Sequence, residues 1–232
     1  MSGKVCLVTG VGPGTGAAIA RRFAKGYRVA MLARDAERLA ALEREIPDAF
    51  GFPCDVSDEA ALRDTIERVR GDHGAPEVVV HNAVGGAFGD FLAIDPQVLR
   101  RNFEVNTMAL LQLGRLLAPS MIEQGRGAIV VTGNTATYRG KADFAGFAPT
   151  KAAQRILAES MARTLGPQGV HVAYLAIDAV IDVPWTRKAF AGAPDAFFCK
   201  PSDIADEVWH LAHQPRSAWT FDVQIRPDGE AW

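Results

Sequence analysis

The sequence predicts an α/β fold in which one doubly wound parallel sheet is flanked by helices. Short runs rich in β-branched residues alternate with longer amphipathic stretches along all 232 residues. Several of the runs, such as VCLVT and AIVVT, are apolar almost throughout. Strands covered by helices on both faces have this composition. No repeat or linker interrupts the alternation, so a single domain over residues 1–232 is expected.

Seven runs are expected to be strands of one sheet. They cover residues 4–9, 28–32, 49–53, 78–81, 127–132, 171–177 and 221–225. The amphipathic stretches between them are expected to be helices. They cover residues 14–25, 36–45, 58–70, 96–118, 148–165 and 202–213. Ser57 and Ser202 are expected to cap the helices that follow them, because acidic residues come next in each first turn.

Residues 183–201 form the longest segment without a clear period. The segment contains Trp185, Phe190, Phe197 and Phe198. Aromatic residues in an irregular segment after a late strand are typical of a lid over a ligand cleft. A loop that packs its aromatic rings on its own domain has the same composition, so both interpretations stay open at this point.

Composition and charge argue against several classes of function. The formal net charge is -2, which gives no electrostatic reason to expect a nucleic acid partner. No apolar run approaches the roughly 18 residues of a membrane span, and the first strand begins too early to leave room for a signal peptide. Cys6, Cys54 and Cys199 are far apart and form no C-x-x-C pair. A disulfide framework or zinc site is therefore not expected, and the cytoplasm is the expected location.

A glycine-rich loop, TGVGPGTG at residues 9–16, lies between the first strand and the first helix. Glycines there permit a tight turn and close approach of the backbone to a pyrophosphate, and the helix N-terminus offers free N–H groups to the phosphates. This placement predicts a Rossmann-type dinucleotide site, with a glycine-rich turn that binds nothing as the alternative. The expected contacts are Gly10, Gly12, Pro13, Gly14 and Thr15.

The T-G-x-x-x-G-x-G spacing resembles the short-chain dehydrogenase/reductase family, and further matches follow in that family's order. Asp55 and Val56, in CDV, match the place where the family's acidic residue meets the adenine. Asn82 and Ala83, in HNAV, resemble the family's N-N-A-G. The resemblance implies that these four residues contact the cofactor.

The same resemblance implies a catalytic set. In this family a tyrosine is the general acid and base, a lysine one turn later holds the ribose, a serine orients the carbonyl, and an asparagine supports a relay water. Lys151 matches the lysine and Asn106, in FEVN, matches the asparagine. Phe147 stands four residues before Lys151, where the tyrosine is expected, and Asn134, in TGNTA, stands where the serine is expected.

These replacements change the expected chemistry. A phenyl ring transfers no proton, and general acid–base catalysis typically contributes about 10²–10⁴-fold. The amide of Asn134 can still donate a hydrogen bond to a carbonyl. The family's P-G pair after the sixth strand is also absent, since Ile177 and Asp178 stand there. Tyr138, Asp178 or Lys151 acting through a bound water could supply the proton, and the sequence does not rank them.

The end of the second strand, AMLAR, favours NADP(H) over NAD(H). Ala33 stands where an acidic residue would bind the ribose of NAD, and Arg34 follows it. An arginine suits a 2′-phosphate through charge-assisted hydrogen bonds. Asp35 comes next, so a slip of one residue would reverse the preference.

Two hypotheses about function follow. The first is an atypical oxidoreductase that moves hydride between NADP(H) and a fairly hydrophobic carbonyl or alcohol substrate, contacted by Tyr138 and Trp185. The second is a non-catalytic NADP(H)-binding sensor or partner protein, favoured by Phe147 and the missing P-G pair. The resemblance also implies a homodimer or homotetramer, whose interface would include the very apolar residues 110–122.

Overall fold

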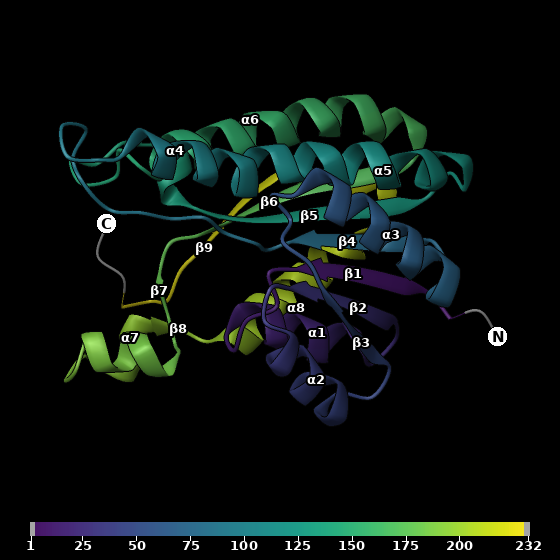
Figure 1. The fold of residues 1–232 in the computed structure, drawn as a ribbon, viewed down its shortest axis with the longest axis horizontal. Coiled ribbons are helices and arrows are strands. Elements are labelled where there is room, and N and C mark those ends of the chain that lie inside the picture. Colours follow the sequence, from purple (N-terminus) through teal and green to yellow (C-terminus); the bar gives the residue numbers. More distant parts are fainter. Residues whose placement is uncertain (1–2, 230–232) are drawn as a thin grey trace.

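The computed structural model describes residues 3–229, and within them seven parallel strands form one sheet, as predicted (Figure 1). The strands are β1 (Val5–Thr9), β2 (Arg28–Ala33), β3 (Ala49–Pro53), β4 (Pro76–His81), β5 (Gly127–Asn134), β6 (Val170–Ile177) and β9 (Asp222–Ile225). Their order in space is β3-β2-β1-β4-β5-β6-β9. The order reverses between β1 and β4, so the sheet is the doubly wound Rossmann-type sheet that the sequence predicts.

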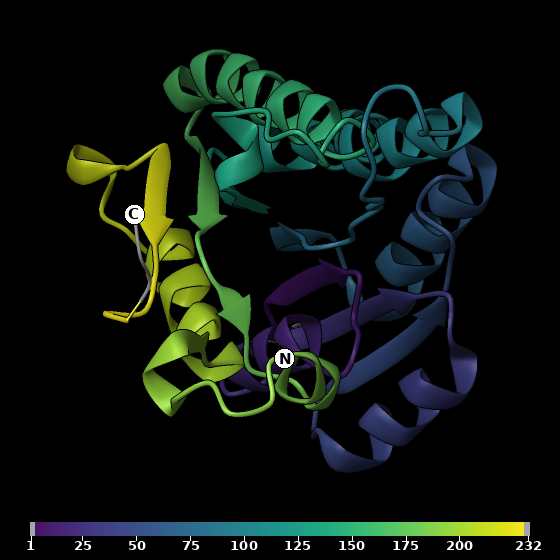
Figure 2. The same cartoon turned by 90° about the vertical axis from the view of Figure 1, so that its left-hand side faces the viewer.

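Two helix layers cover the two faces of the sheet (Figures 1 and 2). One layer holds α3 (Glu59–His73), α4 (Pro96–Phe103), α5 (Ala109–Glu123) and α6 (Ala148–Leu165). The other holds α1 (Thr15–Phe23), α2 (Ala36–Glu45) and α8 (Pro201–Ala212). Alternate residues of β1 belong to opposite cores: Leu7 lies in the α3/α5/α6 core and Val8 in the α1/α2/α8 core. A strand buried on both faces needs apolar residues at every position, which explains VCLVT.

Three expectations about helices were wrong in detail. The stretch 96–118 is not one helix, because a π-helical turn at Glu104–Met108 separates α4 from α5. Asp58, not Ser57, caps α3, because its carboxylate accepts the Ala61 N–H at 3.0 Å. Ser202 lies inside the first turn of α8 after Pro201, so it cannot be the cap. Within residues 3–229, no helix is long and apolar enough to cross a membrane.

The segment 183–201 is more regular than its sequence suggests. It contains α7 (Pro184–Ala189) and β8 (Phe198–Cys199), which pairs with β7 (Val180–Ile181) in a small separate sheet. The rings of Phe197 and Phe198 contact each other at a centroid distance of 5.1 Å. In both ribbon views α7 lies on the opposite side of the molecule from α6 (Figures 1 and 2). The contact between Phe197 and Phe198 shows that part of the segment's aromatic surface packs on the segment itself.

Gly133→Ala is expected to destabilise the fold. A Cβ at this position of β5 would lie 2.1 Å from the Tyr174 hydroxyl oxygen and 2.2 Å from Cζ, so the buried ring would have to move. Overpacking of this kind typically costs about 1–3 kcal/mol. Urea unfolding measures the loss, and Gly140→Ala is the matched control because no atom lies within 4 Å of its added Cβ. Equal stability of the two variants would contradict this prediction.

Candidate functional site

The site lies where the strand order reverses, at the carboxyl ends of β1 and β4. The loop after β1 turns at Gly10, whose φ of +70° favours glycine. A Cβ there would lie 2.5 Å from the Ala83 backbone, and a Cβ at Gly16 would lie 2.5 Å from the Gly10 carbonyl oxygen. Glycine is therefore required at both positions, because the loop packs against the chain after β4 and against its own helix.

The glycine loop leaves groups that fit a phosphate. The Thr15 hydroxyl oxygen is buried without a hydrogen-bond partner, and it is the only such side-chain atom within residues 3–229. No side chain caps α1 at Gly14, and the Ala17 N–H donates to the Gly12 carbonyl, which leaves the N–H groups of Thr15 and Gly16 to bind an anion. Nothing lies within 4 Å of a Cβ built on Gly12, and Pro13 beside it is exposed. These features fit the pyrophosphate of a dinucleotide.

Asn82 fixes the loop from behind. Its side-chain amide donates to the Gly10 carbonyl at 2.9 Å and accepts from the Thr132 hydroxyl at 3.1 Å. It therefore connects β1, β4 and β5 at their carboxyl ends, with Ala83 buried beside it. Both polar groups of the Asn82 amide thus form hydrogen bonds within the protein that position the glycine loop.

Asp55 and Val56 follow β3 and have different environments. The Asp55 carboxylate accepts from the Ser57 N–H at 3.0 Å and from the Ser57 hydroxyl at 2.7 Å. Burial raises the pKa of Asp55, but these hydrogen bonds and the charge of Arg34 outweigh it, so the net shift is downward. Val56 is buried in the core. Asp55 is therefore an ionised hydrogen-bond acceptor just after the carboxyl end of β3.

The next pair of residues bears on cofactor preference. Arg34 follows the last residue of β2 and is exposed. Asp35 is the N-cap of α2, where its carboxylate accepts the Arg38 N–H at 2.9 Å. The same carboxylate pairs with the Arg38 guanidinium at 2.8 Å. Asp35 is thus engaged in its own helix, whereas the Arg34 guanidinium is open to a ligand.

Asn106 lies in the π-helical turn and is fully buried. Its side chain accepts the Gly85 N–H at 2.9 Å and donates to the Gly85 carbonyl and to the Thr150 hydroxyl, each at 2.8 Å. These bonds tie the loop after β4 to the start of α6. The Asn106 carbonyl faces the interior, where the side chains of His81 and Gln154 bond to it.

Lys151, in the first turn of α6, is only 2% exposed. Its ammonium donates to the Thr132 carbonyl at 3.1 Å and to the side-chain oxygen of Gln154. Burial lowers the pKa of Lys151 to about 7, because the desolvated ammonium loses its hydration. Near neutral pH this amine can therefore both donate and accept a proton.

Phe147 precedes Lys151 by four residues, and Asn134 ends β5, the strand whose Thr132 carbonyl accepts from Lys151. Phe147 directly precedes α6, and its ring, 7% exposed, packs with Phe144, Ala136 and Ala148. The Asn134 side-chain oxygen accepts the Ala136 N–H at 3.1 Å in a turn after β5. Within residues 3–229, no group accepts a hydrogen bond from the Asn134 NH₂, so this donor is available to a ligand.

Two further proton-donor candidates are engaged elsewhere. The Tyr138 hydroxyl donates to Asp222 on β9, and burial together with this bond raises the pKa of Tyr138 to about 12. The Asp178 carboxylate accepts from the Thr135 hydroxyl at 2.7 Å and from the Gln224 amide at 3.1 Å. The Tyr138 hydroxyl is therefore a poor proton donor near neutral pH, and two donors engage the Asp178 carboxylate.

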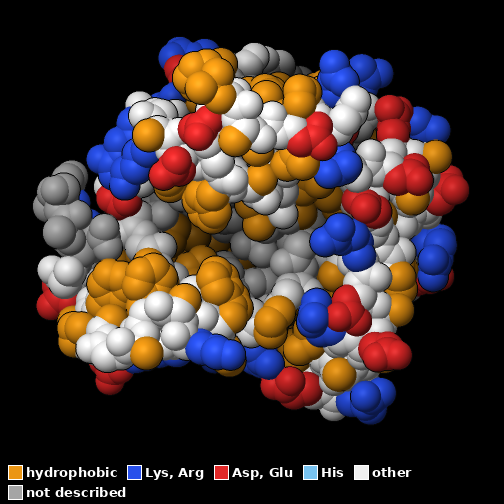
Figure 3. Space-filling view, turned by 60° about the vertical axis from the view of Figure 1, so that its left-hand side comes forward, with side chains coloured by type: hydrophobic (Ala, Val, Ile, Leu, Met, Phe, Trp, Pro, Cys, Tyr) orange, Lys and Arg blue, Asp and Glu red, His pale blue; other side chains and the backbone are white. Residues whose placement is uncertain are grey.

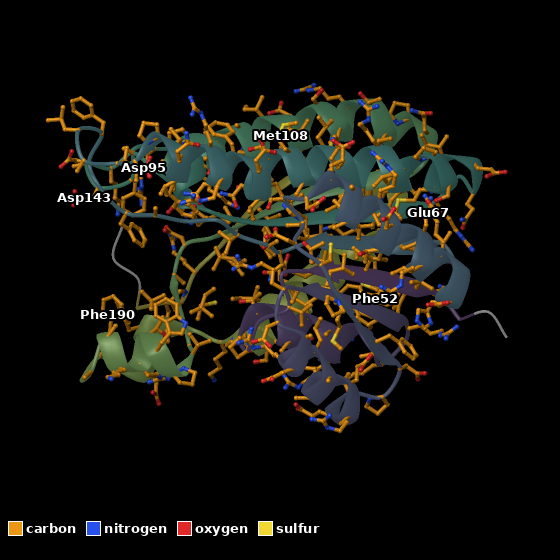
Figure 4. All side chains as sticks on the ribbon, in the orientation of Figure 1. Phe52, Glu67, Asp95, Met108, Asp143 and Phe190 are labelled. Carbon is orange, nitrogen blue, oxygen red and sulfur yellow. The ribbon has the colours of Figure 1, made fainter. Side chains whose placement is uncertain are left out.

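The face that holds these groups is hollowed, with hydrophobic side chains on both sides of the hollow (Figure 3). Phe88, on the loop after β4, is 74% exposed, and Trp185, on α7, is 69% exposed. Val183, just before α7, touches the glycine loop, because a Cβ on Gly14 would lie 2.8 Å from it. Figure 4 shows Phe190 at the end of α7 and Asp143, before α6, on the side of the molecule where α4 and α6 lie.

Comparison with known proteins agrees with this geometry. The sequence profile of the family described as short chain dehydrogenase matches residues 4–191 of the chain. The protein belongs to this family. Within it, D-erythrulose reductase of Gallus gallus is 37% identical, over 98% of this chain and 95% of that protein. Carbonyl reductase (NADPH) 2 of Sus scrofa is 32% identical, over 98% and 96% respectively.

A solved structure gives the same result for the fold. A metagenomic short-chain oxidoreductase in complex with NADP matches this protein with a TM-score of 0.85. The two chains are 33% identical, and the match covers 99% of each. The fold of this protein is therefore that of a solved member of the family.

Two polar residues of the site were not predicted from the sequence. Gln154 is fully buried and bonds Lys151, and His81 is fully buried and bonds the Asn106 carbonyl. Gln154 gave one usable signal. It follows Lys151 by three residues, and so shares its inward face of the helix.

Proposed function

We propose that the protein is an NADP(H)-dependent oxidoreductase that interconverts a small carbonyl compound and its alcohol, with an altered catalytic set. The observation that carries the proposal is the unpaired Thr15 hydroxyl at the N-terminus of α1. Asn82 connects the glycine loop to Thr132, whose carbonyl accepts a hydrogen bond from the buried Lys151. The names of the relatives support it, since they are reductases and one is specified for NADPH. Phe147 and Asn134 replace the tyrosine and serine of the family's usual set.

Each part of the cofactor has a group to hold it. Thr15 and the first N–H groups of α1 would bind the pyrophosphate, Asp55 the adenine, Arg34 the 2′-phosphate and Lys151 the ribose. When bound, the cofactor supplies hydride to the carbonyl carbon. The NH₂ of Asn134 donates a hydrogen bond to the carbonyl oxygen, which stabilises the negative charge that develops there.

Lys151 supplies the proton in this proposal. Its ammonium gives a proton, through one bound water, to the oxygen that becomes the alcohol. The resulting neutral amine takes a proton back from solvent. Tyr138 and Asp178 are less suitable, because Asp222 engages the tyrosine hydroxyl and hydrogen bonds from two side chains hold the aspartate in place. A lysine whose pKa lies near 7 matches the requirement for acid–base work at neutral pH.

Arg34→Leu is expected to weaken NADPH binding by about 10–100-fold and to change NADH binding little. The reason is the loss of charge-assisted hydrogen bonds to the 2′-phosphate, which NADH lacks. Fluorescence titration with each cofactor measures the effect. Arg44→Leu, at the far end of α2, is the control and should change neither affinity. Tighter binding of NADH than NADPH by the wild type would contradict the cofactor assignment.

A non-catalytic NADP(H)-binding sensor is the second candidate, because the ring of Phe147 cannot transfer a proton. A screen of the wild type with NADPH against diverse aldehydes and ketones separates the two. Turnover of any of them excludes the sensor, whereas tight binding without turnover favours it. If neither dinucleotide binds, both functions are wrong. The hydrophobic substrate, the role of 183–201 as a lid, the homo-oligomer and the cytoplasmic location remain predictions.

A further inference from the structure

The polar side chain of Gln154 is fully buried on the inward face of α6. The proposed function gives it no role. Its Nε2 donates to the Asn106 carbonyl at 2.7 Å, and its Oε1 accepts from the Lys151 ammonium. A carbonyl can only accept and an ammonium can only donate. The orientation of the amide is therefore fixed, since a flip would place NH₂ against the ammonium.

The network continues on the other side of Asn106. The Asn106 carbonyl also lies 3.3 Å from His81 Nε2, and Nδ1 of His81 lies 3.0 Å from the Thr9 hydroxyl. The Asn106 carbonyl can only accept, so His81 carries its proton on Nε2. Nδ1 of the neutral ring therefore accepts from the Thr9 hydroxyl, which in turn accepts the Ala83 N–H at 3.3 Å. Burial and the charge of Lys151 lower the pKa of His81 to about 4. The histidine is neutral, and Lys151 carries the charge of the network.

We propose that Gln154 is the positioning residue of Lys151. Its amide holds the ammonium between Gln154 Oε1 and the Thr132 carbonyl, and connects it to the Asn106 carbonyl without a carboxylate. An ammonium has three N–H bonds, so one is left to donate to a cofactor or substrate. The role of that bond rests on the proposed function, whereas the contact with Lys151 stands independently of it.

The neutrality of Gln154 is essential to this arrangement. The charge of Lys151 acts on His81 from β4, and the Tyr174 hydroxyl from β6 donates to Gln154 Oε1 at 3.5 Å. Burial keeps both side chains uncharged near neutral pH. Within residues 3–229, no carboxylate bonds to the Lys151 ammonium. A carboxylate in place of the Gln154 amide would stabilise the charged lysine, because an opposite charge in contact favours the ionised form.

The test measures the titration of Lys151 by NMR on protein labelled at the lysine ε carbons, without any cofactor. Lys151→Met assigns its resonance among those of the remaining lysines, Lys4, Lys25, Lys141, Lys188 and Lys200. Gln154→Glu is expected to raise the titration midpoint of Lys151 by about 1–3 pH units. Gln168→Glu makes the same change on the surface and should leave the midpoint unchanged.

A second variant tests position rather than charge. Gln154→Met keeps the length of the side chain but removes the acceptor, so Lys151 loses one of its two protein partners. NADPH affinity is expected to fall by about tenfold, the typical effect of losing a hydrogen bond to a charged group. Gln154→Glu restores an acceptor for the lysine, so it should bind NADPH more tightly than Gln154→Met does.

The outcomes separate this proposal from the proposed function. If Lys151 titrates at the same pH in Gln154→Glu and in the wild type, the amide does not hold the ammonium and the proposal is wrong. If Gln154→Glu does not fold, unchanged NADPH affinity and an unchanged Lys151 resonance in Gln154→Met overturn it. A wild type that reduces no carbonyl contradicts the proposed function alone, because the titration needs no turnover.

Discussion

Lys151→Met is expected to lower kcat/KM for carbonyl reduction by at least about 10²–10⁴-fold, the usual contribution of a general acid. The substitution keeps an unbranched side chain in the buried site but removes both the proton and the ribose contact. The pH profile of the wild type is the accompanying measurement. Because the pKa of Lys151 is about 7, the rate of reduction should fall as pH rises through that value, since the neutral amine has no proton to give.

The free energy of unfolding shows whether Lys151→Met loses activity because it lacks the lysine or because it unfolds. Burial lowers the pKa of Lys151 from 10.5 to about 7, so between these values the unfolded chain binds more protons than the folded one. The free energy of unfolding of the wild type should therefore rise with pH across this window, and Lys151→Met should lack that rise. Lys25→Met is the control, because Lys25 is exposed and lies just after α1. Undiminished reduction by Lys151→Met would mean that another group supplies the proton.

The sheet was predictable because its strands are buried on both faces. Complete burial leaves an apolar run such as VCLVT, and this signal needs no knowledge of the neighbouring strands. The π-helical turn at Glu104–Met108 was not predictable, because the apolar period runs through it with little change. Asp58 and Ser57 are adjacent and both suit an N-cap, so their order could not be decided from residue type.

In the candidate site, residues required by the local backbone conformation were easier to predict than residues whose hydrogen-bond partners lie far away in the sequence. Gly10 was predictable because the turn needs a positive φ, and its close approach to Ala83 agrees. Gln154 and His81 were not, because a polar residue in a helix or strand pattern usually faces solvent. Both side chains bond the Asn106 carbonyl, which is 25 residues from His81 and 48 from Gln154 in the chain. Only the folded structure therefore shows that their polar atoms have hydrogen-bond partners.

The same reasoning limits Tyr138 as a catalytic candidate. The sequence places it in the loop after β5, close to the expected substrate. The structure shows that the Tyr138 hydroxyl donates a hydrogen bond to Asp222, while Arg155 donates to the same carboxylate at 2.6 Å and lies over the tyrosine ring. This arrangement ties the loop to β9. Tyr138 can still contact a substrate through its half-exposed ring, which leaves that prediction open.

Phe147→Tyr is expected to raise the rate of carbonyl reduction by about 10²-fold or more, which would be the largest gain from a single substitution in this site. The ring stands one helical turn before Lys151, whose positive charge at neutral pH and below would lower the pKa of a tyrosine hydroxyl there. The hydroxyl would restore a proton donor that the phenyl ring lacks. Adding Asn134→Ser should raise the rate further if a hydroxyl orients the carbonyl better than an amide. Steady-state NADPH oxidation measures both variants.

Phe144→Tyr is the matched control, because Phe144 packs against the same small cluster but does not share the helix face of Lys151. It should leave the rate unchanged. If the wild type is inactive and the double variant reduces carbonyls, the cofactor site is intact and the ring at 147 is what prevents chemistry, as a sensor requires. If the wild type turns over well and Phe147→Tyr brings no gain, the buried lysine already supplies the proton at full efficiency. If the wild type and the double variant are both inactive while NADPH still binds, another residue prevents the reaction. Asp178, the acidic residue after β6, is then the next residue to replace.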